Sequence, residues 1–260
     1  MDCILLAGGT PGPADSLFTH TQGKPKALLQ IGQTTMVGHV IEALIEAKSV
    51  QNIAVVGIEN FDSKRLGYPI DFLPDRGSMI ANALAGTEWL MQTNQKSNHT
   101  LFCTSDIPTI TGPIIDRFVA SCSPLDFAGY YSMVTREVME ERFPNSGRTF
   151  VNLDNVFLAG GDLVIARPDL AEANRELLQM IAAGRKQAWK LARIVGALTL
   201  LKFLVHRVSI SDMESKAKKV FKQPVKVMVS PDAELAMDVD NADHLALMRQ
   251  YFDDSTAILL

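Results

Sequence analysis

The amino-acid sequence predicts an α/β fold built around a mostly parallel β-sheet. Through residues 1–125, short apolar runs alternate with longer segments of helical periodicity, a pattern typical of βαβ units. After residue 168, three helical patterns follow one another with no strand between them. We therefore expect a single domain over residues 1–260, with a helical insertion or subdomain at 169–222 that covers or completes a site on the core.

The first half of the chain contains three apolar runs that we expect to be buried strands, at 3–7, 52–58 and 99–106. Helical periodicity follows each of them, at 34–47, 77–92 and 111–121. In the last of these helices, Thr111 is suited to cap the first turn, and Pro113 fits a position where no backbone N–H is needed.

The second half of the chain no longer alternates short strands with helices. Residues 126–135 and 155–169 read as extended, and the three consecutive helical patterns span 170–184, 185–208 and 211–221. Ser211 or Asp212 is expected to cap the third of these helices. A strand at 225–230, a short segment "LAMDVD" at 235–240 and a closing helix at 242–252 complete the chain.

Composition argues against two classes of partner. The chain has 25 basic and 29 acidic residues and a net charge of −4, so it lacks the basic excess that is usual for nucleic-acid binding. The most apolar run, residues 194–205, contains Lys202 and is shorter than a bilayer-spanning helix. We expect no membrane association and a cytoplasmic location, and we expect this run to be buried or to pack against a second copy in a homodimer.

Polar residues follow several of the expected strands. Gly8 and Gly9 end the first strand, Asp106 ends the third, and Asp238 and Asp240 come after "LAM" near the carboxyl end. In open parallel sheets, ligands bind beyond the carboxyl ends of the strands, so these residues are expected to meet. Glycines let anionic oxygens approach the backbone closely, and carboxylates can share a Mg²⁺ with substrate phosphates. The pattern indicates metal-assisted phosphoryl chemistry.

The glycine-rich segment fits neither of two common nucleotide-binding motifs. A Walker loop requires Ser or Thr after Gly-Lys, but Gly23-Lys24 is followed by Pro25. The run "GGTPGP" lacks the third glycine of a dinucleotide fingerprint, and Pro11 and Pro13 prevent a helix from starting there.

A family resemblance does fit. The segments "LLAGG…KPKALLQIGQTTMVGHVIEAL", "SDIP" and "MDVDNADHLALM" occur in the order expected for MobA-like NTP transferases. This resemblance covers roughly residues 2–165 and 224–250. It implies a Rossmann-like, three-layer, mostly parallel sheet of the nucleotide-diphospho-sugar transferase (GT-A) type, with a helical insertion.

The resemblance also implies a reaction. A phosphate of a small-molecule acceptor would attack the α-phosphorus of an NTP, with GTP or CTP favoured, and pyrophosphate would leave. Asp106 and Asp240 would bind Mg²⁺, and Lys26 would act beside them as the third catalytic residue by neutralising the α-phosphate. The nucleotide-binding residues that it implies are Leu6, Ala7, Gly8, Gly9, Lys24, Lys26, Arg76, Gly77 and Ser78. The acceptor-binding residues assigned with it are Arg148, Gly160, Gly161, Asp162 and Lys190. Molybdopterin, a sugar phosphate and a cobinamide phosphate all remain open as acceptors.

Two other functions remain open. One is a glycosyltransferase that uses a nucleotide-sugar, with Asp106 as its metal ligand. The other is a non-catalytic nucleotide-binding module, because relatives usually carry an arginine just after the glycines and residues 8–24 contain none. Several residues also have purely structural readings: Asp238, Asp243 and Ser78 as helix caps, and Arg76, Arg148 and Lys190 as surface charges.

Overall fold

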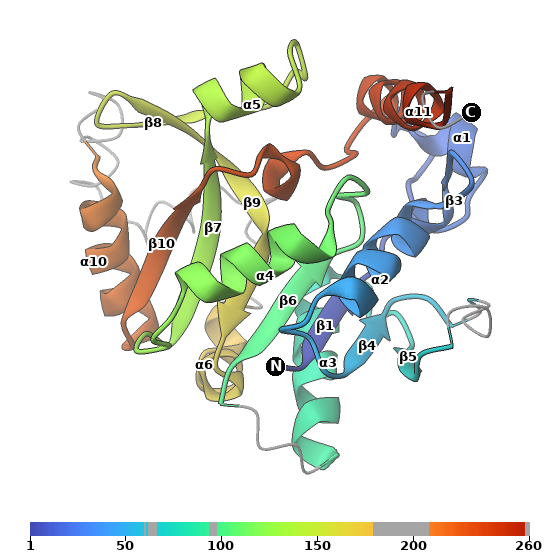
Figure 1. Ribbon diagram of the computed structural model, residues 1–260. Coiled ribbons are helices and arrows are strands. Elements are labelled where there is room, and N and C mark those ends of the chain that lie inside the picture. Colours follow the sequence, from blue (N-terminus) through green and yellow to red (C-terminus); the bar gives the residue numbers. More distant parts are fainter. Residues whose placement is uncertain (60, 62–66, 94–97, 179–207, 258–260) are drawn as a thin grey trace.

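The computed structural model describes the whole chain except residues 60, 62–66, 94–97, 179–207 and 258–260. Within the described residues, an eight-stranded sheet forms the centre of the molecule, with strand order β10-β7-β9-β6-β1-β4-β5 and β8 paired to β9 (Figure 1). The strands are β1 (Cys3–Leu6), β4 (Ile53–Val56), β5 (Ile70–Leu73), β6 (Thr100–Thr104), β7 (Gly129–Thr135), β8 (Val151–Leu153), β9 (Val156–Ala166) and β10 (Val225–Ser230).

The sheet is mostly parallel, as the alternation of strands and helices predicts. β1 lies between β6 and β4 and is parallel to both, β5 is parallel to β4, and β10 is parallel to β7. β9 is the exception, because it runs antiparallel between β6 and β7 and also pairs antiparallel with β8. The carboxyl ends of β1, β4 and β6 therefore meet at one edge.

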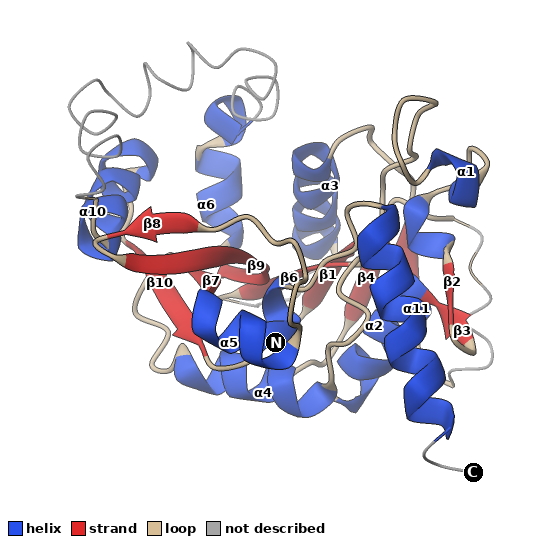
Figure 2. Ribbon diagram, turned by 90° about the horizontal axis from the view of Figure 1, so that it is seen from above, coloured by secondary structure: helices blue, strands red, loops and turns tan. Residues whose placement is uncertain are grey.

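Helices cover both faces of the sheet, which gives three layers (Figure 2). α2 (Met36–Glu46) and α4 (Gly112–Ser121) pack on one face, whereas α3 (Met79–Gln92), α6 (Pro168–Ala173) and α10 (Ile210–Phe221) lie on the other. The remaining described helices are α1 (Phe18–Thr21), α5 (Arg136–Arg142) and α11 (Ala242–Ala257).

The strand β1 shows why its sequence is continuously apolar. Its alternate side chains point to opposite faces: Cys3 and Leu5 pack in the main core with α2 and α4, and Ile4 packs with the residues under α3. Both faces are covered, so each of these three side chains is fully buried. Such two-sided burial is typical of a central parallel strand.

Some predicted elements need correction. The helix α10 begins at Ile210, and its cap is Ser209, not Ser211 or Asp212: the Ser209 side chain accepts from the backbone N–H of Asp212, whose carboxylate accepts in return from the Ser209 N–H. Thr111 occupies the cap position of α4 without a side-chain hydrogen bond. The two-stranded hairpin of β2 (Gln30–Ile31) and β3 (Thr34–Thr35) was not predicted, because its strands are too short for a periodicity. The strand β5 was also not predicted: none of its four residues is fully buried, so it lacks the continuous apolar run of β1 and β4.

The segment before Asp238 is also not a strand. Residues Ala233–Ala236 form a 3₁₀ turn (η3), after which the chain crosses the edge of the sheet as a loop. Asp238 and Asp240 therefore reach the site from this loop and not from a strand end. Three of the four residues of this turn are buried, so the apolar run reflects packing under the loop.

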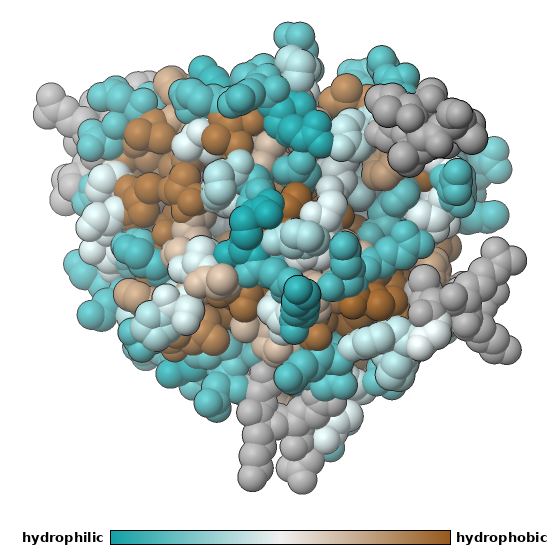
Figure 3. All heavy atoms as spheres, in the orientation of Figure 1, coloured by the Kyte–Doolittle hydropathy of each residue, from teal (hydrophilic) through white to brown (hydrophobic). Residues whose placement is uncertain are grey.

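The predicted insertion lies between β9 and β10. Its described parts include α6 and α10, whereas Lys190 and the apolar run at 194–205 lie outside the described residues. In the part of the chain that the structure describes, no helix is long and apolar enough to cross a bilayer. On the face seen in Figure 3, hydrophilic side chains surround separate apolar areas.

Gly57 offers a test of how the fold shapes the edge of the sheet. It follows β4 with a φ of 116°, and a Cβ there would lie 2.2 Å from the backbone nitrogen of Gly8. We expect Gly57→Ala to lower the free energy of unfolding by at least about 2 kcal/mol, because strain and a backbone clash add. Chemical denaturation would measure the loss.

Gly67→Ala is the matched control, since Gly67 has a φ of 61° and nothing within 4 Å of its Cβ position. It should cost only the left-handed conformation, about 1 kcal/mol. Equal losses in the two variants would contradict the close approach of Gly57 to Gly8.

Candidate active site

Three backbone segments meet at the carboxyl edge of the sheet. The backbone N–H of Ser105, after β6, donates to the carbonyl of Leu6 at the end of β1, 3.0 Å away. The N–H of Val239 donates to the carbonyl of Asp106 over 2.8 Å, and that of Lys26 to the carbonyl of Gly9 over 3.1 Å. These bonds join the glycine loop (residues 7–13), the end of β6 and the loop of residues 237–241 (the 237–241 loop).

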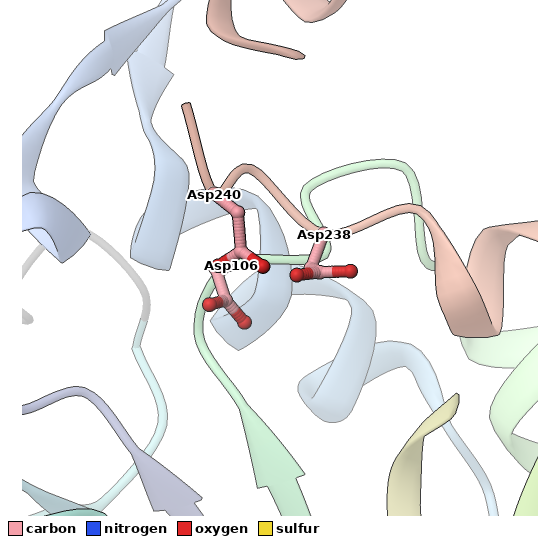
Figure 4. A group of neighbouring side chains, drawn as sticks. All are labelled: Asp106, Asp238 and Asp240. Carbon is pink, nitrogen blue, oxygen red and sulfur yellow. The ribbon is translucent and has the colours of Figure 1, made fainter. Parts of the chain in front are cut away.

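This convergence creates an aspartate cluster, which we define as Asp106, Asp238 and Asp240. Figure 4 shows the three side chains pointing toward one another from the end of β6 and from the 237–241 loop. Each offers an oxygen within 4.8 Å of the others. Asp106 and Asp238 are buried, and Asp240 is exposed. Of the three, Asp238 is the one that sequence reasoning left out of the metal ligands; its burial shows only in the folded chain.

Two cations face the aspartate cluster. The Nζ of Lys26 lies 2.6 Å from Oδ2 of Asp106 and 3.5 Å from Oδ1 of Asp240. Arg148 forms an ion pair with Asp238, and its guanidinium is 4.0 Å from Oδ2 of Asp240. Arg148 comes from the 143–150 loop between α5 and β8, and only 13% of its side chain is exposed. It is therefore a partly buried partner of the cluster and not a solvated surface charge.

The electrostatics follow from this crowding. Burial raises the pKa of Asp238 to about 8, helped by a hydrogen bond with Asp240 and by repulsion from Asp106, and opposed by Arg148. Burial alone would also raise the pKa of Asp240, but that hydrogen bond and the charge of Lys26 lower it instead. Burial would lower the pKa of Lys26, yet the neighbouring Asp106 raises it well above its ordinary value. Lys26 thus stays charged, and the proton shared in the hydrogen bond between Asp238 and Asp240 favours Asp238.

The cluster suits a divalent metal. Oxygen ligands of this kind are preferred by Mg²⁺, which is usually bound through one or two carboxylates and substrate phosphates. Oδ1 of Asp106 is buried and has no hydrogen-bond partner among the described residues, which is costly unless something binds there. The chemistry and the burial of the donors fit such an ion.

The glycine loop borders a small pocket beside the aspartate cluster. Its lining comes from β1, β6, α3 and the loops that follow these strands: Leu6, Gly8, Lys26, Met79, Asn82, Thr104, Ser105 and Asp106. Gly9 has a φ of 109°, and nothing lies within 4 Å of its Cβ position, so its backbone faces open space. Ala7 is fully buried and contributes only its backbone, while Lys24 is exposed in the turn after α1. Of the predicted nucleotide-binding residues, Leu6, Gly8 and Lys26 thus line one pocket.

The segment 75–78 lies next to Gly8. A Cβ on Gly8 would come within 2.3 Å of the Asn82 side-chain nitrogen and 2.7 Å of an Asp75 oxygen. Asn82 donates to Asp75 and accepts from the backbone N–H of Arg76, so its amide fixes this turn. Gly77 has a φ of 81°, the Arg76 side chain is exposed, and Ser78 caps α3. Asp75 and Asn82 are contacts that the sequence analysis missed.

The predicted acceptor-binding residues do not lie together: some belong to β9, one contacts the aspartate cluster, and one is outside the described residues. Gly160 and Gly161 lie in β9, where added Cβ atoms would each come within 2.3 Å of a hydroxyl oxygen of β7, that of Tyr131 or Ser132. Asp162 follows them, and burial and repulsion from Asp106 raise its pKa well above the ordinary value. Arg148 contacts the aspartate cluster, and Lys190 is outside the described residues. The glycines therefore allow β9 to pack closely against β7.

Comparison with known proteins identifies the family. Residues 3–195 match the family of MobA-like NTP transferase domains. A solved structure described as a hypothetical transferase from Thermus thermophilus is 31% identical, with a TM-score of 0.80 over 94% of this chain and 98% of that one. A comparison with curated proteins finds no significant match.

More distant structures share the fold. A CMP:2-keto-3-deoxy-manno-octonic acid synthetase complexed with CTP is 11% identical, with a TM-score of 0.57 over 98% of both chains. The 2-C-methyl-D-erythritol 4-phosphate cytidylyltransferase of Thermus thermophilus is 15% identical, with a TM-score of 0.55 over 96% of this chain and 98% of that one. With its family match spanning most of the sheet and the glycine loop, this chain belongs to the MobA-like NTP transferase domain family and is a nucleotidyltransferase.

Proposed function

We propose that this protein transfers a nucleoside monophosphate from an NTP, GTP or CTP, to a phosphate of a small-molecule acceptor, with release of pyrophosphate and dependence on Mg²⁺. The observation that carries the proposal is the aspartate cluster beside Lys26 and the glycine loop. Glycines without a Cβ, three carboxylates and an ammonium group lie side by side there, which are the groups that a metal-bound triphosphate requires.

The chain would bind the nucleotide mainly through its backbone. Gly8 and Gly9 present main chain without a Cβ, so phosphate or sugar oxygens can approach closely. Gly8 is also backed by Asn82 and Asp75, which hold the turn around Gly77 in place. The segment 76–78, which precedes the pocket residue Met79, would contact the nucleoside. Lys24, exposed in the turn after α1, is available to the outer phosphates.

The aspartate cluster would hold the metal. Asp106 and Asp240 are the proposed ligands, and Asp238 lies next to both. When bound, Mg²⁺ neutralises the phosphate charge that develops as the bond to pyrophosphate breaks. The carboxylates of the chain fix where this neutralisation occurs, because Asp106 is buried and its loop is hydrogen-bonded to the 237–241 loop.

Lys26 is proposed to stabilise the transferring α-phosphate. In the ligand-free arrangement its ammonium group compensates Asp106 and Asp240. Occupation of the carboxylates by a metal would release this ammonium to a phosphate oxygen, where positioned charge is worth more than in water. In the ligand-free arrangement Asp106 raises the pKa of Lys26, so this side chain is protonated when a nucleotide arrives. Together with Arg148, Lys26 supplies positive charge in a site whose glycine loop lacks an arginine.

The acceptor would approach over β9, with Gly160, Gly161 and Asp162 on its path and Lys190 contributed by the insertion. In-line attack requires the acceptor phosphate opposite the leaving pyrophosphate. The chain's part in this step is positioning, and no protein nucleophile is needed.

Removal of Asp106 tests the proposal. Asp106→Asn should reduce pyrophosphate release from NTP, Mg²⁺ and a panel of phosphorylated acceptors by about 100-fold or more, since several kcal/mol of charge stabilisation are lost. Asp71→Asn, a change of the exposed aspartate on β5, is the control and should leave the rate unchanged. Full activity of Asp106→Asn would contradict the proposal, and release of a nucleoside diphosphate from a nucleotide-sugar would indicate glycosyl transfer instead.

The pH dependence of metal binding gives a second test. The pKa of Asp238 is raised to about 8, partly by a hydrogen bond with the proposed ligand Asp240, so a cation that binds Asp240 competes with the proton in that bond. We expect the affinity for Mn²⁺ to rise by up to about tenfold per pH unit from pH 6 to pH 8 and then to level off. Electron paramagnetic resonance of free Mn²⁺ would measure it. Asp238→Asn should flatten the profile, and a flat profile in the wild-type protein would contradict a protonated Asp238.

A further inference from the structure

His244 lies directly behind the aspartate cluster, in the first turn of α11. Its residue is 5% exposed, and its Nδ1 accepts a hydrogen bond from the backbone N–H of Asp240 over 3.3 Å. The Asn241 side chain accepts from the N–H of His244 over 2.9 Å, which caps the helix and fixes the turn that carries the ring. The ring is therefore a rigid support for the backbone at Asp240.

The same ring also reaches the 143–150 loop. Its Nε2 lies 3.9 Å from the position that a Cβ would take on Gly147, the residue before Arg148. The imidazole thus bonds to the 237–241 loop and lies next to the loop that carries Arg148. Arg148 in turn is ion-paired with Asp238, so both contacts act on the same short segment.

Met237 and Val239 anchor this segment in the core, but few hydrogen bonds hold its backbone. It follows a 3₁₀ turn and belongs to no strand, so no ladder of hydrogen bonds holds it. Val239 donates to Asp106 on one side, and His244 supports the other. Carboxylates within 4.8 Å of one another repel, and 59% of the Asp240 side chain is exposed. A loop held from one side only would be free to move Asp240 away from Asp106.

We propose that His244 is a positioning residue, which holds the backbone of Asp240 and the Arg148 loop so that the aspartate cluster is preformed for a divalent metal. The inference rests on the metal site of the proposed function. In many proteins, groups that hydrogen-bond to the metal-binding residues hold those residues in position, and their loss lowers metal affinity about 10- to 100-fold. We assign this role to His244.

Substitutions at His244 separate positioning from packing. His244→Leu keeps an apolar side chain of similar size but removes both ring nitrogens. His244→Asn keeps an acceptor near the Nδ1 position, and His244→Gln extends an amide toward the Nε2 position instead. His99→Leu is the matched control: His99 is also buried, but it precedes β6 at the opposite end of that strand from Asp106.

The experiment measures binding of Mn²⁺ alone to each full-length variant at pH 8, together with its melting temperature. We expect His244→Leu to bind Mn²⁺ at least about tenfold more weakly than wild type, His244→Asn to recover most of this loss, and His99→Leu to lower only the melting temperature. If His244→Leu does not fold, the Mn²⁺ affinities of His244→Asn and His244→Gln are compared instead. His244→Asn should bind Mn²⁺ more tightly than His244→Gln.

Three results would overturn the inference. Folded His244→Leu with wild-type affinity would show that the ring only fills space. Equal weakening in His244→Asn and His244→Gln would show that the Asp240 contact is not what matters. Wild-type protein that binds no Mn²⁺ would overturn the metal site itself, and with it the proposed function, which distinguishes that failure from a failure of His244 alone.

Discussion

The constraint on which this structure depends is the burial of neighbouring carboxylates at one edge of the sheet. Asp106 and Asp238 are each less than a tenth exposed, and placing such charges together is unfavourable unless cations or hydrogen bonds compensate them. Lys26, at the start of a 3₁₀ turn, and Arg148, in the 143–150 loop, provide the compensation. The carboxylate charges of the site are thus compensated in its ligand-free form. This compensation changes when a metal and a triphosphate bind.

The fold provides this site through backbone geometry. β1, β4 and β6 are parallel neighbours, so their ends open onto the same edge, and Gly57 approaches Gly8 so closely that only glycine fits. The 237–241 loop is joined to β6 by the bond from Val239 to Asp106. Each arrangement brings together residues that are far apart in the sequence, which is what a binding site on a parallel sheet requires.

The strand ends that form the site could be predicted from the sequence, because they depend on local residue patterns. The apolar runs that end in Gly8 and in Asp106 mark the ends of two strands. The carboxyl ends of parallel strands lie at the same edge of a sheet, so both residues could be assigned to that edge from the sequence. The family resemblance added Lys26 and Asp240, which the structure brings to within 3.5 Å of each other.

What the sequence concealed depends on tertiary contacts. Arg148 reads as a surface charge until the 143–150 loop folds back onto Asp238. Asn82 and Asp75 become relevant only because a Cβ at Gly8 would collide with them. His244 looks like an isolated histidine on a helix, and its contact with Asp240 depends on the cap at Asn241. The 3₁₀ turn before Asp238 has the apolar composition of a strand, because packing under a loop also requires apolar residues.

The most direct measurement is a crystal structure with Mn²⁺ and a non-hydrolysable NTP, with the metal located by anomalous scattering. We predict one Mn²⁺ directly bound to oxygens of Asp106 and Asp240 and to a phosphate oxygen. We also predict that Lys26 has left Asp106 for the α-phosphate. A metal bound elsewhere, with the 2.6 Å contact between Lys26 and Asp106 intact, would contradict the account.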